Sequence, residues 1–310
     1  MKIDILIPTY DGSKYICEQI DSILAQDYKD FNIIIKDDKS RDNTFDLICD
    51  KYGHINNITI LSSDENQGYQ QNYIDLMVYS NADLVMLCDQ DDVWRPNKIS
   101  TILNHPNIND KYLMISNDAR VVDANLNVIS KTYAGAYCKQ ESIYSLTYCN
   151  HTQGCAITIN KKLKDLFLLY RTGLPYDWHI NFVAKALGAK YYIDEQLQDY
   201  RRHNSNTTSI LSVDNLDFIN RYRVFDIIYS APVIGTFITI INILKEAIDD
   251  QLPKDTEVAL GIFQKIKDKK ELILNNLTIE DANVETKVTC LDDIVNFYNN
   301  LIDKLNQHNL

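Results

Sequence analysis

The sequence lacks the features that mark several broad classes of protein. Its seven cysteines include no CxxC pair and no regular spacing, which is typical of free thiols in a reducing compartment rather than of a disulfide framework. Basic residues are outnumbered by acidic ones, 31 to 43, and the net charge of −12 disfavours a nucleic-acid partner, which needs a basic surface. No basic and apolar leader precedes the first predicted strand. We therefore expect a cytoplasmic protein, with the inner face of the cell membrane as the alternative location.

Long apolar runs are scarce as well, with one exception. The 18 positions from Ile227 to Leu244 contain no charged residue, a length that borders on a membrane span. Pro232, Gly235 and Asn242 interrupt the run. We expect a pair of buried helices here, with an interfacial membrane-docking helix as the second reading and a true span as the third.

The first 100 residues alternate strand and helix patterns, which predicts a mostly parallel sheet with flanking crossover helices. Strands are predicted at 3–8, 31–36, 58–61 and 84–88, and helices at 13–24, 44–52 and 68–80. Further along, the patterns predict a strand at 113–116, a hairpin within 119–130, helices at 161–169 and 176–187, a strand at 190–193 and a strand-like stretch at 197–200. A polar stretch at 205–212 is the expected linker. We therefore predict an α/β domain at 1–210 and a helical region at 211–310, which would serve oligomerisation or docking.

Acidic residues gather where a buried strand is predicted to end. The apolar run Leu84–Cys88 is followed by Asp89, Asp91 and Asp92, three acids within four residues. Such close like charges repel, and burying them unpaired is costly. A divalent cation with hard oxygen ligands, Mg²⁺ or Mn²⁺, would remove the conflict, whereas the alternative is a solvated acidic loop. An EF-hand calcium loop is excluded, because Trp94 stands where that loop needs glycine.

Two other polar clusters follow predicted strands, at Thr9-Tyr10-Asp11 and at Asp37-Asp38. Ligands of open α/β sheets bind at the carboxyl ends of strands, so the three clusters predict one ligand site. Tyr10 offers a face on which a pyrimidine stacks, and the Asp38 carboxylate could accept a hydrogen bond from the imide N–H of uracil or thymine. The alternatives are a packing aromatic and ordinary helix-capping acids.

These clusters carry a resemblance to a known family. Pro8-Thr9-Tyr10-Asp11-Gly12, the run Asp37 to Thr44, and Asp89-Gln90-Asp91-Asp92 resemble, in order and spacing, the family 2 glycosyltransferases. Val93-Trp94, Tyr176-Asp177-Trp178 and Tyr200 to His203 look most like the rhamnosyltransferase branch. The resemblance covers roughly residues 1 to 207. It implies a GT-A fold, which is a Rossmann-like sheet with flanking helices, and a nucleotide-diphosphate-sugar donor.

The resemblance also implies roles for the motif residues. Thr9, Tyr10 and Asp38 would contact the donor base, Asp89 would approach the ribose, and Asp91 would hold Mg²⁺ or Mn²⁺. Asp92 would be a further metal ligand, an acid behind the ligands, or a contact to the donor or acceptor. The cation would bridge the two phosphates and offset charge on the leaving diphosphate. Asp11 and Lys39 depart from the family, which usually has Asn and Gly there. Asp11 could instead cap the following helix.

Transfer with inversion needs a single carboxylate base, because one in-line displacement requires only the acceptor hydroxyl to lose its proton. Asp177 is the candidate, since it follows Gly173-Leu174-Pro175 near a predicted helix start. Simple helix capping is the alternative role for this residue. The family commonly has an acid directly before the base, where this chain has Tyr176.

Several weaker assignments complete the predicted site. Trp94 and Trp178 would be platforms for sugar rings, or core residues. His203 would complete the metal shell or bind diphosphate, and Arg201 would contact phosphate. Gly154 resembles the family's loop beside the transferred sugar. Residues 204–209 suit a loop that orders over the bound donor.

We therefore expect an inverting, metal-dependent glycosyltransferase that uses a dTDP- or UDP-sugar, with dTDP-rhamnose favoured by the resemblance. The expected acceptor is a growing polysaccharide or a lipid-linked glycan, and a homo-oligomer is a further expectation. Three alternatives stay open: a UDP-hexose transferase of the same fold, a nucleotidyltransferase, and a catalytically silent partner-binding module. The nucleotidyltransferase is disfavoured because the loop from Thr9 to Ser13 holds one glycine instead of a glycine-rich run.

Overall fold

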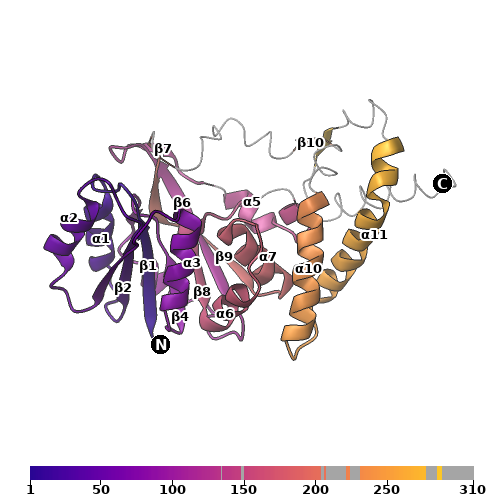
Figure 1. Ribbon diagram of the computed structural model, residues 1–310, viewed down its shortest axis with the longest axis horizontal. Helices are drawn as coiled ribbons and strands as arrows, with labels where there is room; N and C mark the ends of the chain where they lie inside the picture. Colours follow the sequence, from indigo (N-terminus) through magenta and orange to yellow (C-terminus); the bar gives the residue numbers. More distant parts are fainter. Residues whose placement is uncertain are drawn as a thin grey trace. The chain divides into compact units, whose positions relative to one another are not determined.

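The computed structural model describes residues 1–133, 135–147, 150–203, 206, 221–223, 231–276 and 285–287 (Figure 1). The chain divides into two compact units. Unit 1 comprises Met1–Cys138, Thr152–Ala184 and Ala189–Asn206, and unit 2 comprises Lys139–His151, Lys185–Gly188 and Thr207–Leu310. The predicted domain boundary between residues 210 and 211 lies outside the described residues.

Unit 1 is built around a nine-stranded mixed sheet in the order β3-β2-β1-β4-β8-β6-β9-β5, with β7 paired to β6. The strands are β1 (Ile3–Thr9), β2 (Asn32–Asp37), β3 (Ile58–Ser62), β4 (Leu84–Leu87), β5 (Val93–Trp94), β6 (Met114–Val122), β7 (Val128–Ser130), β8 (Ile157–Asn160) and β9 (Lys190–Arg201). Strands β1 to β4 are mutually parallel, whereas β8 is antiparallel to both of its neighbours. The carboxyl ends of β1, β2 and β4 therefore meet at one edge of the sheet, as the sequence predicted.

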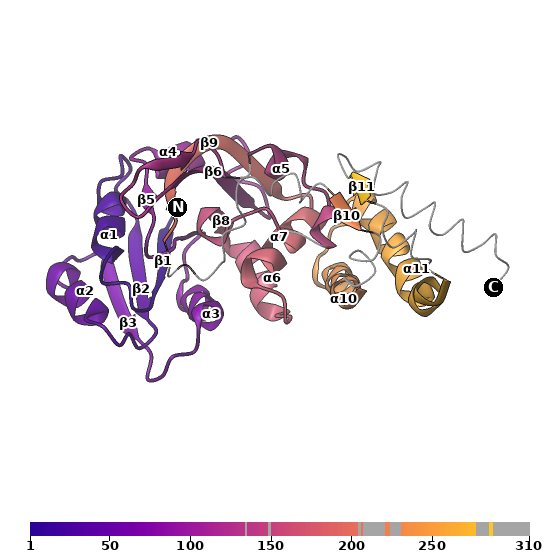
Figure 2. The same cartoon turned by 90° about the horizontal axis from the view of Figure 1, so that it is seen from above.

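Helices cover both faces of this sheet (Figure 2). In unit 1 they are α1 (Ile16–Leu24), α2 (Thr44–Tyr52), α3 (Tyr69–Tyr79), α4 (Lys98–Leu103), α6 (Lys161–Leu169) and the greater part of α7 (Tyr176–Ala186). Alternate residues of a strand point to opposite faces, so Ile3, Ile5 and Ile7 of β1 enter one hydrophobic cluster with the apolar stripes of α1, α2 and α4. Leu6 is equally buried on the other face, which α3 and α6 cover. The near-continuous apolar strands therefore reflect burial on both sides.

The observed elements confirm most of the predicted ones. The helices at 44–52 and 161–169 match exactly, and the first four strands differ by one or two residues at their ends. The predicted strand at 190–193 extends to Arg201, because the segment from Leu197 onward is buried and pairs with β5 and β6. This extension carries the chain back to the edge where β1, β2 and β4 end.

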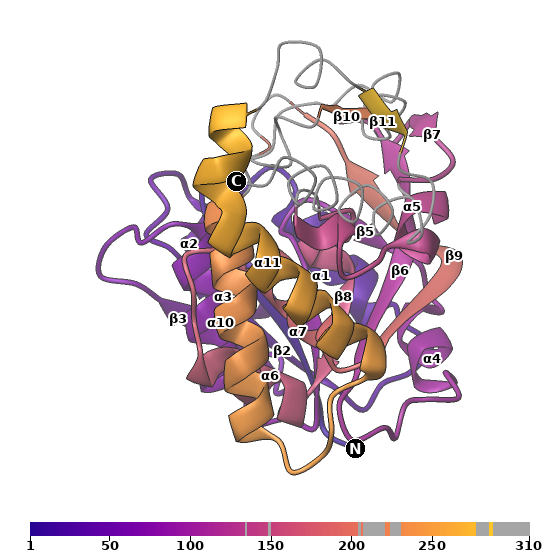
Figure 3. The ribbon, with the colours of Figure 1, turned by 90° about the vertical axis from the view of Figure 1, so that its right-hand side faces the viewer.

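Unit 2 contains the helices α10 (Ala231–Ala247) and α11 (Lys254–Asn276), which pack side by side (Figure 3). From Ala231 onward the uncharged run belongs to a single helix, so the prediction of two helices is wrong there. Among the described residues no helix combines the length and the apolar character that crossing a membrane requires. The region predicted to be helical also contains two antiparallel strands, β10 (Arg221–Arg223) and β11 (Glu285–Lys287), which corrects that prediction.

Three further short elements are α5 (Gly135–Gln140) and the 3-10 helices η1 (Ser145–Thr147) and η2 (Gly154–Ala156). In unit 1, η2 leads directly into β8 and so places Gly154 near the sheet edge. In unit 2, Tyr144 of the segment before η1 makes an edge contact with Phe263 of α11, with ring centroids 5.8 Å apart. This contact ties the segment before η1 to α11.

Candidate active site

A cavity of about 850 Å³ lies in unit 1 where the loops after β1, β2, β4, β6 and β9 meet. It is lined by Tyr10, Asp11, Gly12, Ser13, Lys14, Tyr15, Arg41, Asp42, Gln90, Asp123, Ala124, Asn125, Arg202 and His203. Lys14, Arg41 and Arg202 supply positive charge in an otherwise acidic chain. A cavity that combines an aromatic ring with guanidinium groups suits a ligand with a flat base and phosphates.

The side-chain amide of Gln90 fixes the loop that follows β1. The Tyr10 N–H donates to Gln90 Oε1 and Gln90 Nε2 donates to the Tyr10 carbonyl oxygen, both at 3.0 Å. A Cβ at Gly12 would lie 2.1 Å from Gln90 Oε1, so a side chain here would displace the Gln90 amide from this pair of hydrogen bonds. The Arg41 guanidinium lies 5.5 Å from the centre of the Tyr10 ring. The Tyr10 ring therefore lines the cavity, and its contact with a base stays a prediction.

The loops accommodate both departures from the family pattern. Asp11 accepts hydrogen bonds from the backbone N–H and Nη2 of Arg41, both at 2.7 Å, and these bonds hold the pKa of Asp11 below its usual value. It does not cap α1, whose N-cap is Tyr15, so the capping role is wrong. Lys39 adopts a left-handed φ of 59° and thereby keeps the tight turn, at a cost on the order of 1 kcal/mol.

Thr9 and Asp38 lie beneath the cavity surface. The Thr9 hydroxyl donates to Asp37 Oδ1 at 3.0 Å, and Asp38 accepts from the backbone N–H groups of Gln67 and Gly68. Both residues are almost completely buried, and neither lines the cavity. In this structure Asp38 anchors the start of α3, and its contact with the base stays a prediction.

The acidic loop after β4 directs its carboxylates to different partners. Asp89 accepts a hydrogen bond from the Tyr73 hydroxyl at 2.7 Å, and burial together with the nearby Asp91 charge raises the pKa of Asp89 to about 6. Asp92 is fully buried and accepts from the Arg201 N–H at 3.1 Å and from Gln198 Nε2 at 3.3 Å. Burial also raises the pKa of Asp92 well above its usual range. Asp92 thus holds β9 in place and does not face the cavity, which corrects its predicted contact with the donor or acceptor.

Asp91 and His203 form the pair that the sequence predicted as metal ligands. Asp91 Oδ2 lies 2.8 Å from His203 Nε2, and both side chains are only slightly exposed. The His203 ring stacks on Tyr15 at a centroid distance of 4.8 Å. Asn206 closes the turn, because its Nδ2 donates to Asp91 at 3.3 Å while its Oδ1 accepts from the His203 N–H at 2.6 Å. Residues more than 100 positions apart are thereby brought together at the cavity.

The side chains present fit a divalent cation at this place. Asp91 and His203 supply a carboxylate and an imidazole 2.8 Å apart, ligand types that suit Mn²⁺, while carboxylates with waters suit Mg²⁺. Asp89 lies near enough for the Asp91 charge to raise its pKa, although the donor atoms of the three residues are not gathered within 4.8 Å of one another. A second cluster, in which the donor atoms of Asp89, Asp92 and Cys155 lie within 4.8 Å of one another, fits less well. Burial raises the pKa of the Cys155 thiol well above its usual value, so this thiol keeps its proton. A protonated thiol serves as a hydrogen-bond donor to these acids rather than as a ligand.

Asp177 lies in the first turn of α7, with its Oδ1 accepting from the Trp178 N–H at 2.9 Å. It is close enough to Asp89 for its charge to contribute to the raised pKa of that residue. Tyr176, the preceding residue, is buried against the Tyr73 ring with centroids 4.4 Å apart. The Tyr176 N–H donates to Gln70 Oε1 at 3.0 Å. These contacts fix the start of α7, and hence the candidate base, relative to the acidic loop.

Replacement of Gly154 by alanine tests how tightly the start of α7 is packed. A Cβ at this position would lie 2.0 Å from the Tyr176 hydroxyl oxygen, whereas a Cβ at Gly173 would meet nothing within 4 Å. Gly154→Ala is therefore expected to destabilise the fold by about 1–3 kcal/mol through overpacking, and to lower transfer because Asp177 follows Tyr176. Urea unfolding measures the difference. Gly173→Ala is the matched control, and equal stability of the two variants would contradict the packing described.

His179 of α7 makes stability depend on pH. Its side chain is buried, and burial lowers its pKa to about 4. The folded state keeps this imidazole neutral while the unfolded chain takes up a proton near pH 6.5. The contribution of the neutral His179 to the free energy of unfolding is therefore constant above about pH 6.5 and is lost as the pH falls from there towards 4. Between pH 7 and pH 5, wild type should lose about 2 kcal/mol more than His179→Leu in urea unfolding. Parallel losses in both proteins would contradict the burial of a neutral imidazole.

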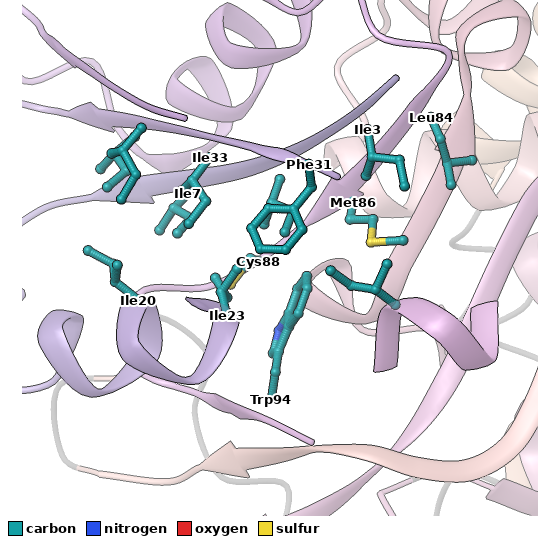
Figure 4. Close-up of a cluster of buried hydrophobic side chains, with 14 of the residues drawn as sticks. Ile3, Ile7, Ile20, Ile23, Phe31, Ile33, Leu84, Met86, Cys88 and Trp94 are labelled. Carbon is teal, nitrogen blue, oxygen red and sulfur yellow. The ribbon is translucent and has the colours of Figure 1, made fainter. Parts of the chain in front are cut away.

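Two predicted contact residues are internal. Trp94 is 2% exposed and packs in the main hydrophobic cluster beside Ile23 and Cys88 (Figure 4), with the Lys98 ammonium 4.0 Å from the ring centre. It is core rather than a sugar platform. Arg201 is also 2% exposed, and its guanidinium is bonded to Glu18 and to backbone carbonyls, including that of Asp91 at 2.7 Å. Its predicted contact with phosphate is wrong, because these bonds occupy the side chain.

Trp178 is half-buried on the first turn of α7, next to Asp177. Its role as a platform for a sugar ring stays a prediction. Of the predicted donor-covering loop at 204–209, only Asn206 belongs to the described residues, and the other positions lie outside them.

Several structurally important residues were not predicted from the sequence. Gln90 clamps the Tyr10 loop, Tyr73 donates to Asp89, and Tyr15 orients His203. Lys98 is 1% exposed and hydrogen-bonded to Gln198, and burial lowers its pKa to about 8. It supplies a positive charge beside the buried Asp92. Gln90 could have been found, since it stands within the acidic motif, but nothing local distinguishes the other three from core residues.

The sequence profile described as Glycosyl transferase family 2 matches residues 4–166, which is more than half of the chain. An uncharacterized glycosyltransferase of Nostoc is 28% identical over 66% of this chain and 66% of its own length. The dTDP-rhamnosyl transferase RfbG of Shigella flexneri is 26% identical over 69% of this chain and 76% of its own length. The chain thus spans about two thirds to three quarters of these curated relatives.

Solved structures share the fold. TarS of S. aureus in complex with UDP-GlcNAc superposes with a TM-score of 0.57 at 14% identity, covering 91% of this chain and 77% of that one. A mannosyltransferase of Pyrobaculum calidifontis in complex with GDP-Man and Mn²⁺ gives a TM-score of 0.51 at 14% identity, covering 90% of this chain and 77% of that one. The mixed sheet with flanking helices is therefore the GT-A fold, as predicted. The chain belongs to glycosyl transferase family 2.

Proposed function

We propose that this protein is an inverting, metal-dependent glycosyltransferase that takes a nucleotide-diphosphate sugar as donor. The observation that carries the proposal is the meeting of Asp89, the Asp91–His203 pair and Asp177 at one edge of the sheet. A cation site, a phosphate-binding surface and a carboxylate base are the three parts that such a transfer requires. Family membership supports the same conclusion.

The donor would bind across the cavity at the sheet edge. Tyr10 offers its ring to the base, and the positive charges of Lys14, Arg41 and Arg202 attract the diphosphate. Asp89, Asp91 and His203 would hold Mg²⁺ or Mn²⁺, which when bound supplies positive charge to the leaving diphosphate. The relative solved with GDP-Man and Mn²⁺ is consistent with this assignment.

The chemical step then rests on one residue of the protein. Asp177 would accept the proton of the acceptor hydroxyl, whose oxygen attacks the anomeric carbon from the face opposite the diphosphate. A single displacement inverts the configuration at that carbon, and no covalent intermediate with the enzyme forms. Asp89 already accepts a hydrogen bond from the Tyr73 hydroxyl. Asp177 is therefore the acid that is available to the acceptor hydroxyl.

For the sugar we propose rhamnose, donated by dTDP-rhamnose. The similarity to the Shigella dTDP-rhamnosyl transferase supports this choice, and so do the Val93-Trp94 and Tyr176-Asp177-Trp178 motifs. A UDP-linked hexose is the second candidate, favoured by the fold shared with the UDP-GlcNAc complex of TarS. Both use a pyrimidine nucleotide, which the Tyr10 ring and Asp38 would serve equally.

A thermal-shift screen against a panel of nucleotide sugars, with and without Mn²⁺, tests this proposal. A ligand that binds the folded state raises its stability by mass action, by about 2.7 kcal/mol at 100 times the Kd. We expect the largest shift with dTDP-rhamnose and Mn²⁺ together. A thermal shift with UDP-sugars but not with dTDP-rhamnose would show that the donor is a UDP-sugar. The absence of any metal-dependent shift would favour a catalytically silent binding module.

For the acceptor we propose a growing polysaccharide or a lipid-linked saccharide. A lipid-linked acceptor would bring the protein to the inner face of the cell membrane, with residues 211–310 as the docking or dimerising region. The net charge of −12 gives no attraction to anionic lipid, so docking would depend on the acceptor or on apolar contact. Co-sedimentation of the full chain with neutral and anionic liposomes tests this, and retention in the supernatant in both cases would contradict it.

A further inference from the structure

An aromatic ring beside the candidate base is left facing solvent. Tyr69, the first residue of α3, has 48% of its surface exposed, whereas Tyr73 one turn later on the same helix is 1% exposed. An exposed aromatic ring offers a flat apolar surface on which a ligand can pack. None of the assigned roles uses this ring, and it does not line the cavity that holds Tyr10 and His203.

The ring of Tyr69 is held in place by its surroundings. It meets Tyr176 edge-on, with ring centroids 6.4 Å apart and an interplanar angle of 68°. The next residue, Gln70, accepts the hydrogen bond from the Tyr176 N–H, and the preceding Gly68 donates its N–H to Asp38 at 2.7 Å. The start of α3 is thus tied to α7 on one side and to the end of β2 on the other. A ring fixed in this way loses little conformational entropy when a ligand packs on it.

Tyr69 lies near two acids of the candidate site, Asp177 and Asp89. Partial burial raises the pKa of its hydroxyl, and the charges of Asp177 and Asp89 add to the rise. The ring therefore lies within electrostatic range of both the candidate base and the acid of the donor site. The ring does not line the cavity that holds Tyr10 and His203, so a sugar that packs on it beside Asp177 would lie outside that cavity.

We propose that Tyr69 forms one wall of an acceptor subsite and packs against the pyranose ring whose hydroxyl Asp177 deprotonates. The π face of an aromatic ring is negative, and the C–H face of a pyranose carries small positive charges, so the two surfaces attract and exclude water together. The phenol hydroxyl adds a group that can bond to a sugar hydroxyl. The proposal rests on the proposed function, because it gives the acceptor a sugar ring at the attacking end.

Saturation-transfer NMR with methyl pyranosides tests the subsite. The probes are the methyl glycosides of rhamnose, glucose, galactose and N-acetylglucosamine, added to the full chain with dTDP or UDP and Mg²⁺. We expect at least one probe to bind, with Tyr69→Ala weakening it about tenfold and Tyr69→Phe by less than about threefold, because the ring supplies most of the contact. Nucleotide affinity, measured by calorimetry, should be unchanged in both variants.

Tyr79→Ala is the matched control. Tyr79 is 54% exposed at the other end of α3, so its replacement removes an equivalent exposed tyrosine ring from the same helix. It should leave glycoside binding unaltered. Binding that is insensitive to Tyr69→Ala, equal loss in Tyr79→Ala, or failure of every probe to bind would each overturn the subsite. Failure of the wild type to bind either nucleotide would instead count against the proposed function.

Discussion

Asp177→Asn is expected to lower the rate of sugar transfer by about 10²- to 10⁴-fold while leaving donor affinity nearly unchanged. The amide is isosteric with the carboxylate and can still accept from the Trp178 N–H, so the start of α7 keeps its geometry. What the variant loses is the ability to take a proton from the acceptor hydroxyl. Steady-state transfer assays and calorimetric donor binding separate the two effects.

Asp165→Asn provides the control for this substitution. Asp165 lies on α6, where it pairs with Lys161 at 2.7 Å and more distantly with Lys164 at 3.9 Å. Its side chain is 47% exposed and lies on a different helix from the candidate base, so its loss should have little effect. Wild-type turnover in Asp177→Asn would show that another group is the base. A parallel loss of donor affinity would instead show that Asp177 belongs to the donor site.

Asp91→Ala is expected to remove metal-dependent donor binding, with a loss of at least about 100-fold in donor affinity in the presence of Mn²⁺. Asp91 pairs with His203 at 2.8 Å and accepts from Asn206, so its carboxylate organises the turn as well as supplying an oxygen ligand. Calorimetric titration of donor with Mn²⁺ measures the loss. With a chelator in place of Mn²⁺, wild type and variant should bind equally weakly.

The control for Asp91 must remove a carboxylate without touching the site. Asp165→Ala does so on the exposed side of α6, and it should bind donor with Mn²⁺ as wild type does. An unchanged titration in Asp91→Ala would refute its role as a ligand. A loss that persists equally in the chelator would indicate a folding defect, which circular dichroism of the variant would detect.

Much of the sheet could be predicted because its signals are local. The apolar strands of the first 100 residues are bounded by turn residues, and α1 shows its buried stripe at Ile16, Ile20 and Ile23. Polar residues directly after strands also have a local signature. The edge where β1, β2 and β4 end could therefore be predicted from the sequence, together with the presence there of Tyr10, Asp89 and Asp91.

Burial of individual side chains depends on contacts that no local pattern contains. Trp94 and Arg201 follow motifs of the family, yet the packing of α1 and α4 encloses Trp94, and the bonds to Glu18 and Asp91 enclose Arg201. Asp92 cannot be told from Asp91 by spacing alone. Its partner, the Arg201 N–H, is 109 positions away, which is why its inward orientation was missed.

Pairings over long distances were missed for the same reason. The strand β10 pairs with β11 across more than 60 residues, from Arg221 to Lys287, within a region whose composition favours helix. Only three residues of each strand take part, which is too short for a recognisable alternation. The joining of the predicted strand at 190–193 and the strand-like stretch at 197–200 into one strand, β9, likewise depends on its partners β5 and β6.

The proposed function depends on Asp89, Asp91 and His203 holding a divalent cation beside a nucleotide diphosphate. Electron paramagnetic resonance of Mn²⁺ tests it most directly, because free Mn²⁺ gives a signal that binding to protein broadens. With dTDP present, the wild-type protein should bind close to one Mn²⁺ per chain and so remove the signal of that free Mn²⁺. Asp91→Ala should leave most of the signal in place. Equal loss of signal in wild type and Asp91→Ala, or none in either, would contradict the account.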